Sequence, residues 1–273
     1  ERDGWIVHSH ERTAVHDVTT FHGPPFKERK KRILDVLSPR IHAWEYLERR
    51  ELCAQNVKMV IPNSILMSEM LRDHYPCCSS RMQDPAYPGV ADHYFDLPRQ
   101  SPGKRIGFIG KEWHRKGLDI ACKLVEQLRM QFPEIVFVVA GPDADQIERL
   151  FSSWPEGSYE LHGWVKTETI LSQVDLLLHP ARAEPFGMVV AEANAVGLPV
   201  LISDQCGIAS LINQNMGRVL PLSDDELWLE ALNEYLKGNK TIERMGLKWA
   251  NLAMQHAELY AQMNNYKLSR NAV

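Results

Sequence analysis

The segment from residue 175 to residue 207, DLLLHPARAEPFGMVVAEANAVGLPVLISDQCG, constrains the fold of this chain more than any other. Its opening apolar run is short enough for a buried strand, and the run breaks at His179-Pro180. A loop with Glu184 follows, and then an apolar helical pattern that contains Glu192 and ends at Gly197. A second apolar run at 200–203 predicts another buried strand. The segment therefore predicts a strand, a loop, a helix and a strand in succession.

Such a unit is suited to bind an anion. The first N–H groups of a helix have no partner within the helix and favour negative charge. The carboxylates of Glu184 and Glu192 could accept hydrogen bonds from hydroxyl groups at the same place. A phosphate attached to a sugar is the ligand that this arrangement suggests.

Length and composition describe an ordinary globular protein. The 273 residues suit one large domain or two smaller ones, with 44% hydrophobic and 24% charged residues. A net charge of −4 gives no electrostatic reason to expect a nucleic acid as partner. No apolar run is long enough for a transmembrane helix, and the start of the chain does not resemble a signal peptide. Because the chain begins with Glu1, we expect a fragment or a processed form.

The cysteines favour a reducing compartment. Five are present, an odd number without metal-ligand spacing, and the adjacent Cys77 and Cys78 are poorly suited to a structural disulfide. We therefore expect a reducing, cytoplasmic setting.

The order of predicted elements indicates an α/β protein with parallel sheets flanked by helices. Strands are predicted at 5–7, 17–21 and 57–61, and helices at 40–52 and from Pro62 to about Tyr75. The proline-rich stretch 76–102 is interpreted as an interdomain linker. From residue 104 strands and helices alternate regularly, which predicts a doubly wound sheet. We expect domains at 1–102 and 103–240, and a last helix at 241–263 within a C-terminal region, 241–273.

A basic turn, GKEWHRKG at 110–117, follows the first strand of the second predicted domain. Lysines in turns are most often surface residues. Here Lys111 and Lys116 lie beside Gly110 and Gly117, near a predicted helix N-terminus, where two ammonium groups suit a diphosphate. Carboxyl ends of parallel strands share one edge of a sheet, so this turn and the segment 175–207 could contact one ligand.

Histidines at 8, 10 and 22 follow the first two predicted strands. A structural role is the ordinary alternative for each, and a metal site lacks a clear ligand set. His22 directly follows a strand and is the best candidate for a general base or a polarising hydrogen bond. For Glu184 and Glu192 the ordinary alternatives are a surface acid and a salt-bridged acid. Glu192 lies among apolar helical residues, where a carboxylate needs partners.

A basic run, KERKKR at 27–32, has two interpretations. It is either a solvated helix face or a contact with an anionic membrane surface or an acidic acceptor. No P-loop, dinucleotide fingerprint or catalytic triad appears, which disfavours nucleotide hydrolysis and hydride transfer.

Several segments together resemble the family 4 retaining glycosyltransferases, which have the GT-B fold of two Rossmann-like domains. The E-x7-E element of that family matches EPFGMVVAE, from Glu184 to Glu192, in full. The other similar segments are Lys111 with Lys116, YPGV at 87–90, VAGP at 139–142, HGWV at 162–165 and TFH at 20–22. HAWEYLERREL, DLLLHPA and Cys206-Gly207 resemble the lipopolysaccharide core glucosyltransferases within the family. Complete members have additional N-terminal strands, so the N-terminal domain is expected to be incomplete.

The resemblance implies a retaining, metal-independent transfer of a sugar from a nucleotide-diphosphate sugar, with UDP favoured, to a glycan or lipopolysaccharide-type acceptor. It implies no cofactor, a cytoplasmic location that includes the inner face of the membrane, and a catalytic role for His22 and Glu184. Glu184 would bind the donor sugar and Glu192 the ribose. The implied donor-binding residues are Gly110, Lys111, Lys116, Glu184, Phe186, Gly187, Met188, Val189 and Glu192. The alternatives are a non-catalytic nucleotide-sugar-binding fragment, or another GT-B enzyme such as an epimerase or a phosphorylase, although the lysine context of a phosphorylase is absent.

Overall fold

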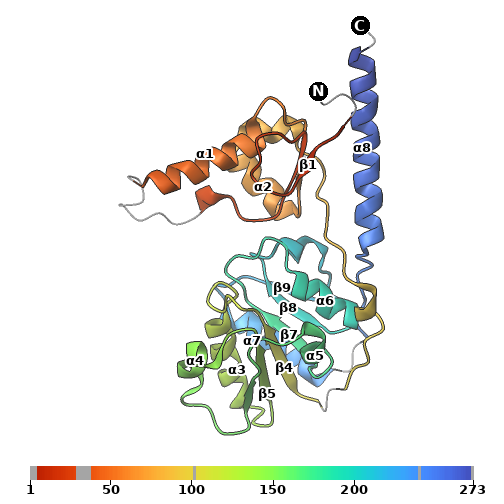
Figure 1. Ribbon diagram of the computed structural model, residues 1–273. Helices are drawn as coiled ribbons and strands as arrows, with labels where there is room; N and C mark the ends of the chain where they lie inside the picture. Colours follow the sequence, from red (N-terminus) through yellow and green to blue (C-terminus); the bar gives the residue numbers. More distant parts are fainter. Residues whose placement is uncertain (1–4, 29–37, 101–102, 239–240, 272–273) are drawn as a thin grey trace. The chain divides into compact units, whose positions relative to one another are not determined.

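The computed structural model describes residues 5–28, 38–100, 103–238 and 241–271, with side chains up to residue 264. The chain divides into two compact units, one of Glu1–Gly89 with Trp249–Val273 (unit 1) and one of Val90–Lys248 (unit 2). This division differs from the predicted boundaries at residues 102 and 240. Both units contain a parallel sheet with helices against it (Figure 1), so the predicted α/β class of parallel sheets flanked by helices is confirmed.

Unit 2 contains a six-stranded sheet in the order β6-β5-β4-β7-β8-β9, and every neighbouring pair is parallel. Its central strands are apolar and buried on both sides, which is typical of parallel sheets covered on two faces. The strands are β4 (Arg105–Ile109), β5 (Val136–Ala140), β6 (Tyr159–Leu161), β7 (Leu176–His179), β8 (Val200–Ser203) and β9 (Gly217–Leu220).

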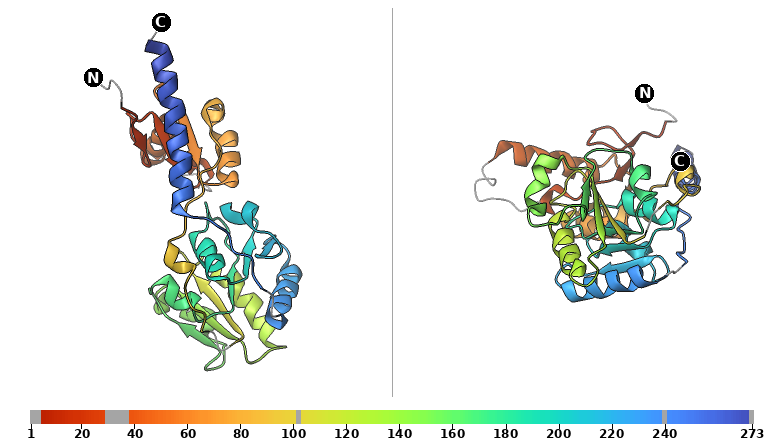
Figure 2. Two further views of the ribbon diagram at one scale, coloured as in Figure 1. Left: turned by 90° about the vertical axis from the view of Figure 1, so that its right-hand side faces the viewer. Right: turned by 90° about the horizontal axis from the view of Figure 1, so that it is seen from below.

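Helices cover this sheet in two groups. The first, α3 (Leu118–Arg129) and α7 (Asp225–Lys237), pack against each other and form the main core with the sheet. The second, α5 (Thr167–Leu171) and α6 (Met188–Val196), also pack together, and Figure 2 shows them apart from the first group. Short turns complete the unit, namely α4 (Ala144–Ile147), η4 (Asp92–Tyr94), η5 (Glu148–Phe151) and η6 (Gly207–Leu211).

The strand order creates a topological switch point between β4 and β7. The chain leaves β4 toward β5 on one side, and β7 lies on the other side of β4. In doubly wound sheets, ligands bind beyond the carboxyl ends of the strands at such a point. The loop at 110–117 and the loop that contains Glu184 begin at these two carboxyl ends.

Unit 1 contains a parallel sheet in the order β1-β2-β3, formed by His8–Ser9, Val18–Phe21 and Met59–Pro62. One face packs against α8 (Trp249–Asn271), through apolar residues that include Leu259. The other face packs against α1 (Pro39–Cys53), α2 (Ile65–His74) and η3 (Pro76–Arg81). A short turn, η1 (Phe26–Glu28), follows β2.

Helix α1 buries two of its carboxylates. Glu48 is 0% and Glu51 3% exposed. Glu48 accepts hydrogen bonds from Arg12 at 3.0 Å and from the Tyr75 hydroxyl at 2.6 Å. Glu51 accepts one from Thr19 at 2.9 Å. These partners offset the cost of removing the two carboxylates from water.

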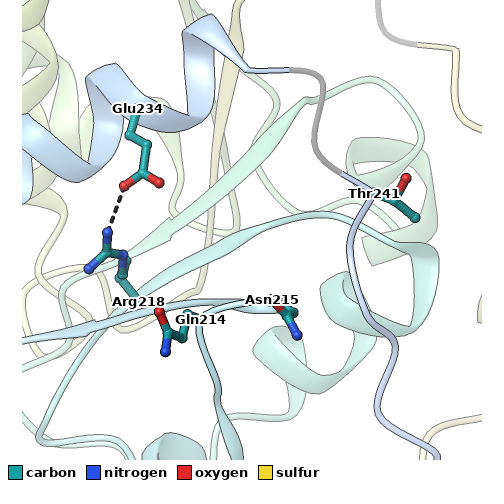
Figure 3. Close-up of a pocket in the computed structure, with 5 residues that line it drawn as sticks. All are labelled: Gln214, Asn215, Arg218, Glu234 and Thr241. Atoms are coloured by element: carbon teal, nitrogen blue, oxygen red, sulfur yellow. Dashed lines mark hydrogen bonds and ion pairs between the residues drawn. The ribbon is translucent and has the colours of Figure 1, made fainter.

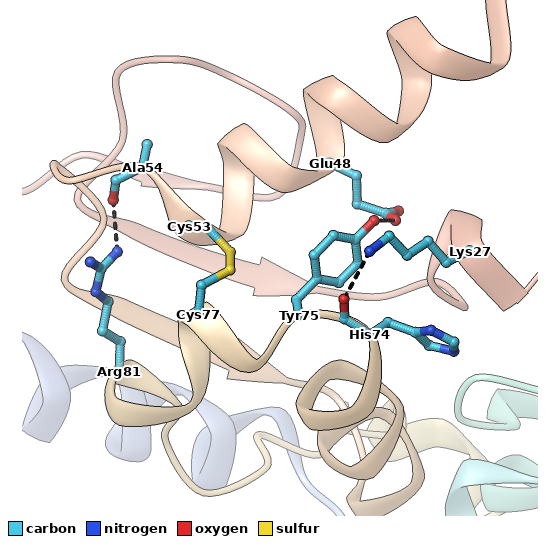
Figure 4. The surroundings of a disulfide bond; sticks show 8 residues. All are labelled: Lys27, Glu48, Cys53, Ala54, His74, Tyr75, Cys77 and Arg81. Atoms are coloured by element: carbon cyan, nitrogen blue, oxygen red, sulfur yellow. Dashed lines mark hydrogen bonds between the residues drawn. A yellow bond between two sulfur atoms is a disulfide. The ribbon is translucent and has the colours of Figure 1, made fainter.

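A disulfide joins Cys53 at the end of α1 to Cys77 in η3 (Figure 4). The cysteines were interpreted as favouring a reducing compartment, and this bond does not fit that interpretation. The interpretation rested partly on the adjacent Cys77-Cys78 pair, whereas the partner of Cys77 comes from another helix, with Cα atoms 5.7 Å apart. Cys78 is a buried free thiol beside the bond.

The stretch at 241–248 is extended, although a helix was predicted from residue 241. The amide of Asn194 donates to the Glu243 carbonyl at 2.9 Å and accepts from the Met245 N–H at 2.6 Å. The Val90 N–H donates to the Leu247 carbonyl at 2.8 Å. These contacts use backbone groups that a helix would need, so α8 begins only at Trp249.

Two other expectations are corrected in part. The stretch 76–102 is not a simple linker, because Cys78 and Ala86 are buried in unit 1 and η4 belongs to unit 2. The first strand is His8–Ser9 and not 5–7. Most of the basic run 27–32 lies outside the described residues. None of the described helices is both long and apolar enough to span a membrane.

Candidate functional site

The two loops at the switch point of unit 2 are in close contact. Gly117 has φ of 79°, and a Cβ atom there would lie 1.9 Å from the Pro180 carbonyl oxygen. The side chain of Lys116 passes directly over Gly110, where a Cβ would lie 2.1 Å from its Cδ atom. Arg182, in the second loop, forms a bidentate ion pair with Asp119 in the first turn of α3, with contacts of 2.7 Å. Only glycine leaves room for the Pro180 carbonyl at position 117 and for the Lys116 side chain at position 110.

The backbone around Glu184 is held by the loop after β8. The Glu184 N–H donates to the Gln205 carbonyl at 3.0 Å, and its carbonyl accepts from the Gly207 N–H at 2.8 Å. The hydroxyl of Ser203 donates to the Ala181 carbonyl at 2.5 Å. Glu184 lies on a loop, but hydrogen bonds at both its N–H and its carbonyl fix its position.

The side chain of Glu184 gathers positive and donor groups around one oxygen atom. Its Oε2 lies 3.1 Å from Lys116 Nζ, 3.4 Å from Arg115 Nη1 and 3.5 Å from His179 Nε2. Burial by itself would raise the pKa of this carboxyl, but the contacts with His179, Lys116 and Arg115 lower it to about 2. Glu184 is therefore ionised at neutral pH.

Helix α6 starts beside this cluster. Gly187 caps it with φ of 112°, and its carbonyl accepts from Val190 and Ala191. The N–H groups of Met188 and Val189 precede these and have no acceptor within the helix. Phe186, which was also predicted to contact the donor, is 3% exposed. Its carbonyl accepts from the Ile208 N–H at 2.8 Å, which helps to position the loop.

Glu192 lies further along α6 in a less favourable setting for charge. Burial, and then the nearby carboxylate of Glu168, raise its pKa to about 7, and Lys116 opposes this shift. Glu168 itself accepts a hydrogen bond from the Tyr94 hydroxyl at 3.3 Å. Glu192 is thus only partly ionised at neutral pH.

The structure brings together most of the predicted donor residues. Gly110, Lys116, Glu184 and Gly187 lie around the cluster, and the exposed Lys111 begins the same loop. His22 belongs to unit 1. There its Nε2 is 2.7 Å from His10 Nδ1. Burial, and then His10, lower the pKa of His22, which favours the neutral imidazole.

Two residues at the cluster were not predicted, Arg115 and His179. Arg115 is the third cation of the turn GKEWHRKG, and three cations within six residues could have indicated it. His179 ends a buried strand at the carboxyl edge of the sheet, and this position was the reason for selecting His22. The same reasoning could have found it.

A separate cavity of about 310 Å³ lies next to β9 and α7 (Figure 3). It is lined by Gln214, Asn215, Arg218, Glu234 and Thr241. Arg218 and Glu234 pair at 2.7 Å across it. None of the predicted site residues lines this cavity. Among the described residues no group of histidine, cysteine and acidic side chains could hold a metal ion.

The fold and the cluster define an α/β protein of the GT-B glycosyltransferase class. The model of the family described as glycosyl transferases group 1 matches residues 92–249, more than half of the chain. The chain belongs to this family.

Among its relatives is the lipopolysaccharide glucosyltransferase WaaG of Escherichia coli, which is 31% identical over 157 residues, 55% of this chain and 41% of WaaG. A GDP-mannose-dependent alpha-mannosyltransferase of Corynebacterium glutamicum is 24% identical over 81% of this chain and 56% of its own length. The chain therefore spans about half the length of these relatives.

Solved structures show the same fold. A crystal structure of WaaG superposes with a TM-score of 0.71 at 22% identity, covering 87% of this chain and 70% of that chain. Anabaena Alr3699/HepE in complex with UDP and glucose superposes with a TM-score of 0.68 at 17% identity, covering 89% of this chain and 71% of that chain.

Proposed function

We propose that this chain binds a nucleotide-diphosphate sugar and transfers the sugar to a glycan or lipopolysaccharide-type acceptor with retention. One observation carries the proposal. Cations, a helix N-terminus and two carboxylates of opposite protonation behaviour meet at the topological switch point of unit 2. Membership of the glycosyl transferases group 1 family supports it.

In this proposal the diphosphate lies between the basic turn and α6. Lys111 and Lys116 supply charge, and the N–H groups of Met188 and Val189 donate to phosphate oxygens. These groups neutralise the charge that develops on the leaving nucleoside diphosphate. We propose that they do this without a metal ion.

The two glutamates have different roles. Glu184, which is ionised, accepts hydrogen bonds from hydroxyls of the donor sugar. Glu192 accepts from the ribose hydroxyls. In unit 1, His22 is the proposed catalytic group of the acceptor side, as a neutral hydrogen-bonding imidazole. The acceptor attacks the face from which the leaving group departs, which would retain the configuration.

Isothermal titration calorimetry with UDP, UDP-glucose, GDP-mannose and UDP-N-acetylglucosamine tests donor binding and selects the donor. We expect Lys116→Ala and Glu192→Ala to weaken binding at least tenfold, about 1.4 kcal/mol. Lys123→Ala is the matched control, because Lys123 on α3 pairs with Asp225 away from the cluster. Equal affinities for the wild type and both site variants would refute the site.

Turnover requires a separate measurement. With the selected donor, transfer to a lipopolysaccharide core acceptor and hydrolysis of the donor are followed by release of the nucleoside diphosphate. Release that depends on the acceptor supports the transferase. Binding without release would favour the alternative of a nucleotide-sugar-binding protein.

We also propose that the chain acts in the cytoplasm at the inner face of a membrane, where a lipid-linked glycan would be presented. Supporting this, α1 exposes aromatic side chains, with Trp44 38% and Tyr46 64% exposed. The basic run at 27–32 precedes this helix in the sequence. Aromatic and basic side chains together suit an anionic lipid surface. The disulfide removes the cysteine-based part of the prediction of a cytoplasmic location.

A further inference from the structure

The proposed function assigns no role to two side chains of the cluster, Arg115 and His179, and His179 is the one that is fully buried. It ends β7, and its ring is 0% exposed. Both ring nitrogens are buried without a hydrogen-bond partner among the described residues. Burying polar atoms without partners is unfavourable, and native proteins mostly avoid it.

The ring of His179 faces one carboxylate oxygen of Glu184. His179 Nε2 lies 3.5 Å from Glu184 Oε2, which is too long for a good hydrogen bond and short enough to become one after a small movement. Burial lowers the pKa of His179, so the ring is neutral and has a single N–H. Facing a carboxylate, that proton belongs on Nε2.

The other two neighbours of Oε2 are side chains that a diphosphate would attract. Lys116 and Arg115 both approach Oε2, and Arg115 is also held by Glu112 at 2.6 Å. Both are partly exposed, 16% and 32%, whereas His179 has no access to solvent. When Lys116 moves onto a phosphate, Oε2 loses its closest partner. His179 is fixed at the end of a buried strand and stays.

We propose that His179 is a positioning residue for Glu184. In the donor complex its Nε2–H donates to Oε2, replaces the contact with Lys116 and keeps the other carboxylate oxygen directed at the sugar hydroxyls. This inference rests on the proposed function and assigns a determinant of sugar binding within it. It predicts that His179 affects the affinity for the sugar part of the donor and not for the nucleoside diphosphate.

Two amides of different length test this role. The side-chain amide of His179→Gln reaches about as far as Nε2, whereas that of His179→Asn ends near the Nδ1 position. Affinities for UDP-glucose and UDP, or for GDP-mannose and GDP if the donor screen selects mannose, are measured by calorimetry. We expect the Asn variant to lose at least fivefold in affinity for the sugar nucleotide, with affinity for the diphosphate changed less than twofold. The Gln variant should remain within twofold of wild type for both ligands.

If both variants lose affinity equally for the sugar nucleotide and for the diphosphate, the role of His179 is merely structural. If a folded Asn variant keeps the wild-type affinity for the sugar nucleotide, the inference is also overturned. If neither variant folds, long-range ¹H–¹⁵N spectra of the wild-type histidines decide. Addition of the donor or of the diphosphate, either of which draws Lys116 onto a phosphate, should then give the signal of a hydrogen-bonded His179 Nε2–H that the free protein lacks. No such signal refutes the inference. Absence of any nucleotide binding by the wild type would instead refute the proposed function.

Discussion

Two glutamates separated by seven residues have opposite protonation behaviour, because their neighbours differ. Glu184 is surrounded by Lys116, Arg115 and His179, which lower its pKa to about 2. Glu192 is buried near a second carboxylate, Glu168, and its pKa rises to about 7. The same residue type therefore provides a fixed charge at one position and a titrating group at the other.

The raised pKa of Glu192 predicts a loss of stability as pH increases. Between its ordinary value of 4.5 and about 7, the unfolded chain releases this proton while the folded chain keeps it. Stability therefore falls across this window, by on the order of 3 kcal/mol, and stays reduced above it. We expect Glu192→Gln to match wild type at pH 4 and to be more stable at pH 8, as measured by urea denaturation. Glu148→Gln, at an exposed site, is the control, and identical pH dependence in all three proteins would contradict the assignment.

At the scale of elements, long-range contacts determine where the helices of both units end and how they are held. Asn194 of α6 binds the extended stretch 241–248 and delays the start of α8. The disulfide fastens the end of α1 to η3, across 24 residues of sequence. Glu48 and Glu51 anchor the same helix through buried hydrogen bonds.

The disulfide predicts a stability effect confined to unit 1. Closing a loop of this length stabilises a fold by about 3 kcal/mol in the chain-entropy description. Dithiothreitol should therefore lower the denaturation midpoint of the wild type and leave that of the Cys53→Ser/Cys77→Ser variant unchanged. Nucleotide affinity should stay the same in both, because the donor cluster lies in unit 2. A reductant-insensitive midpoint for the wild type would argue against the bond.

At the scale of the whole molecule, the two units carry different features. Unit 2 contains the cation and carboxylate cluster, and unit 1 contains His22 and the exposed aromatics of α1. In the proposed function, donor binding depends on unit 2, and contact with the lipid-linked acceptor depends on unit 1.

The proposed membrane contact predicts binding to anionic vesicles. In sedimentation with vesicles of phosphatidylglycerol and phosphatidylethanolamine, Trp44→Ala with Tyr46→Ala should reduce the bound fraction severalfold, because interfacial aromatic contacts are lost. Added salt should release the protein by screening basic residues. Trp164→Ala is the matched control, since Trp164 is 79% exposed in unit 2. Equal binding by all variants would place the contact elsewhere or exclude it.

The amino-acid sequence alone was enough to predict the alternation of strands and helices, the parallel sheets, and the pairing of a basic turn with a helix N-terminus. These follow from apolar periodicity and glycine placement, which act within a few residues. Only the tertiary structure decided that Arg115 and His179 share one carboxylate oxygen with Lys116, that Cys53 pairs with Cys77, and that 241–248 is extended. Each of these depends on groups far apart in the chain, and their distances are set by how whole elements pack.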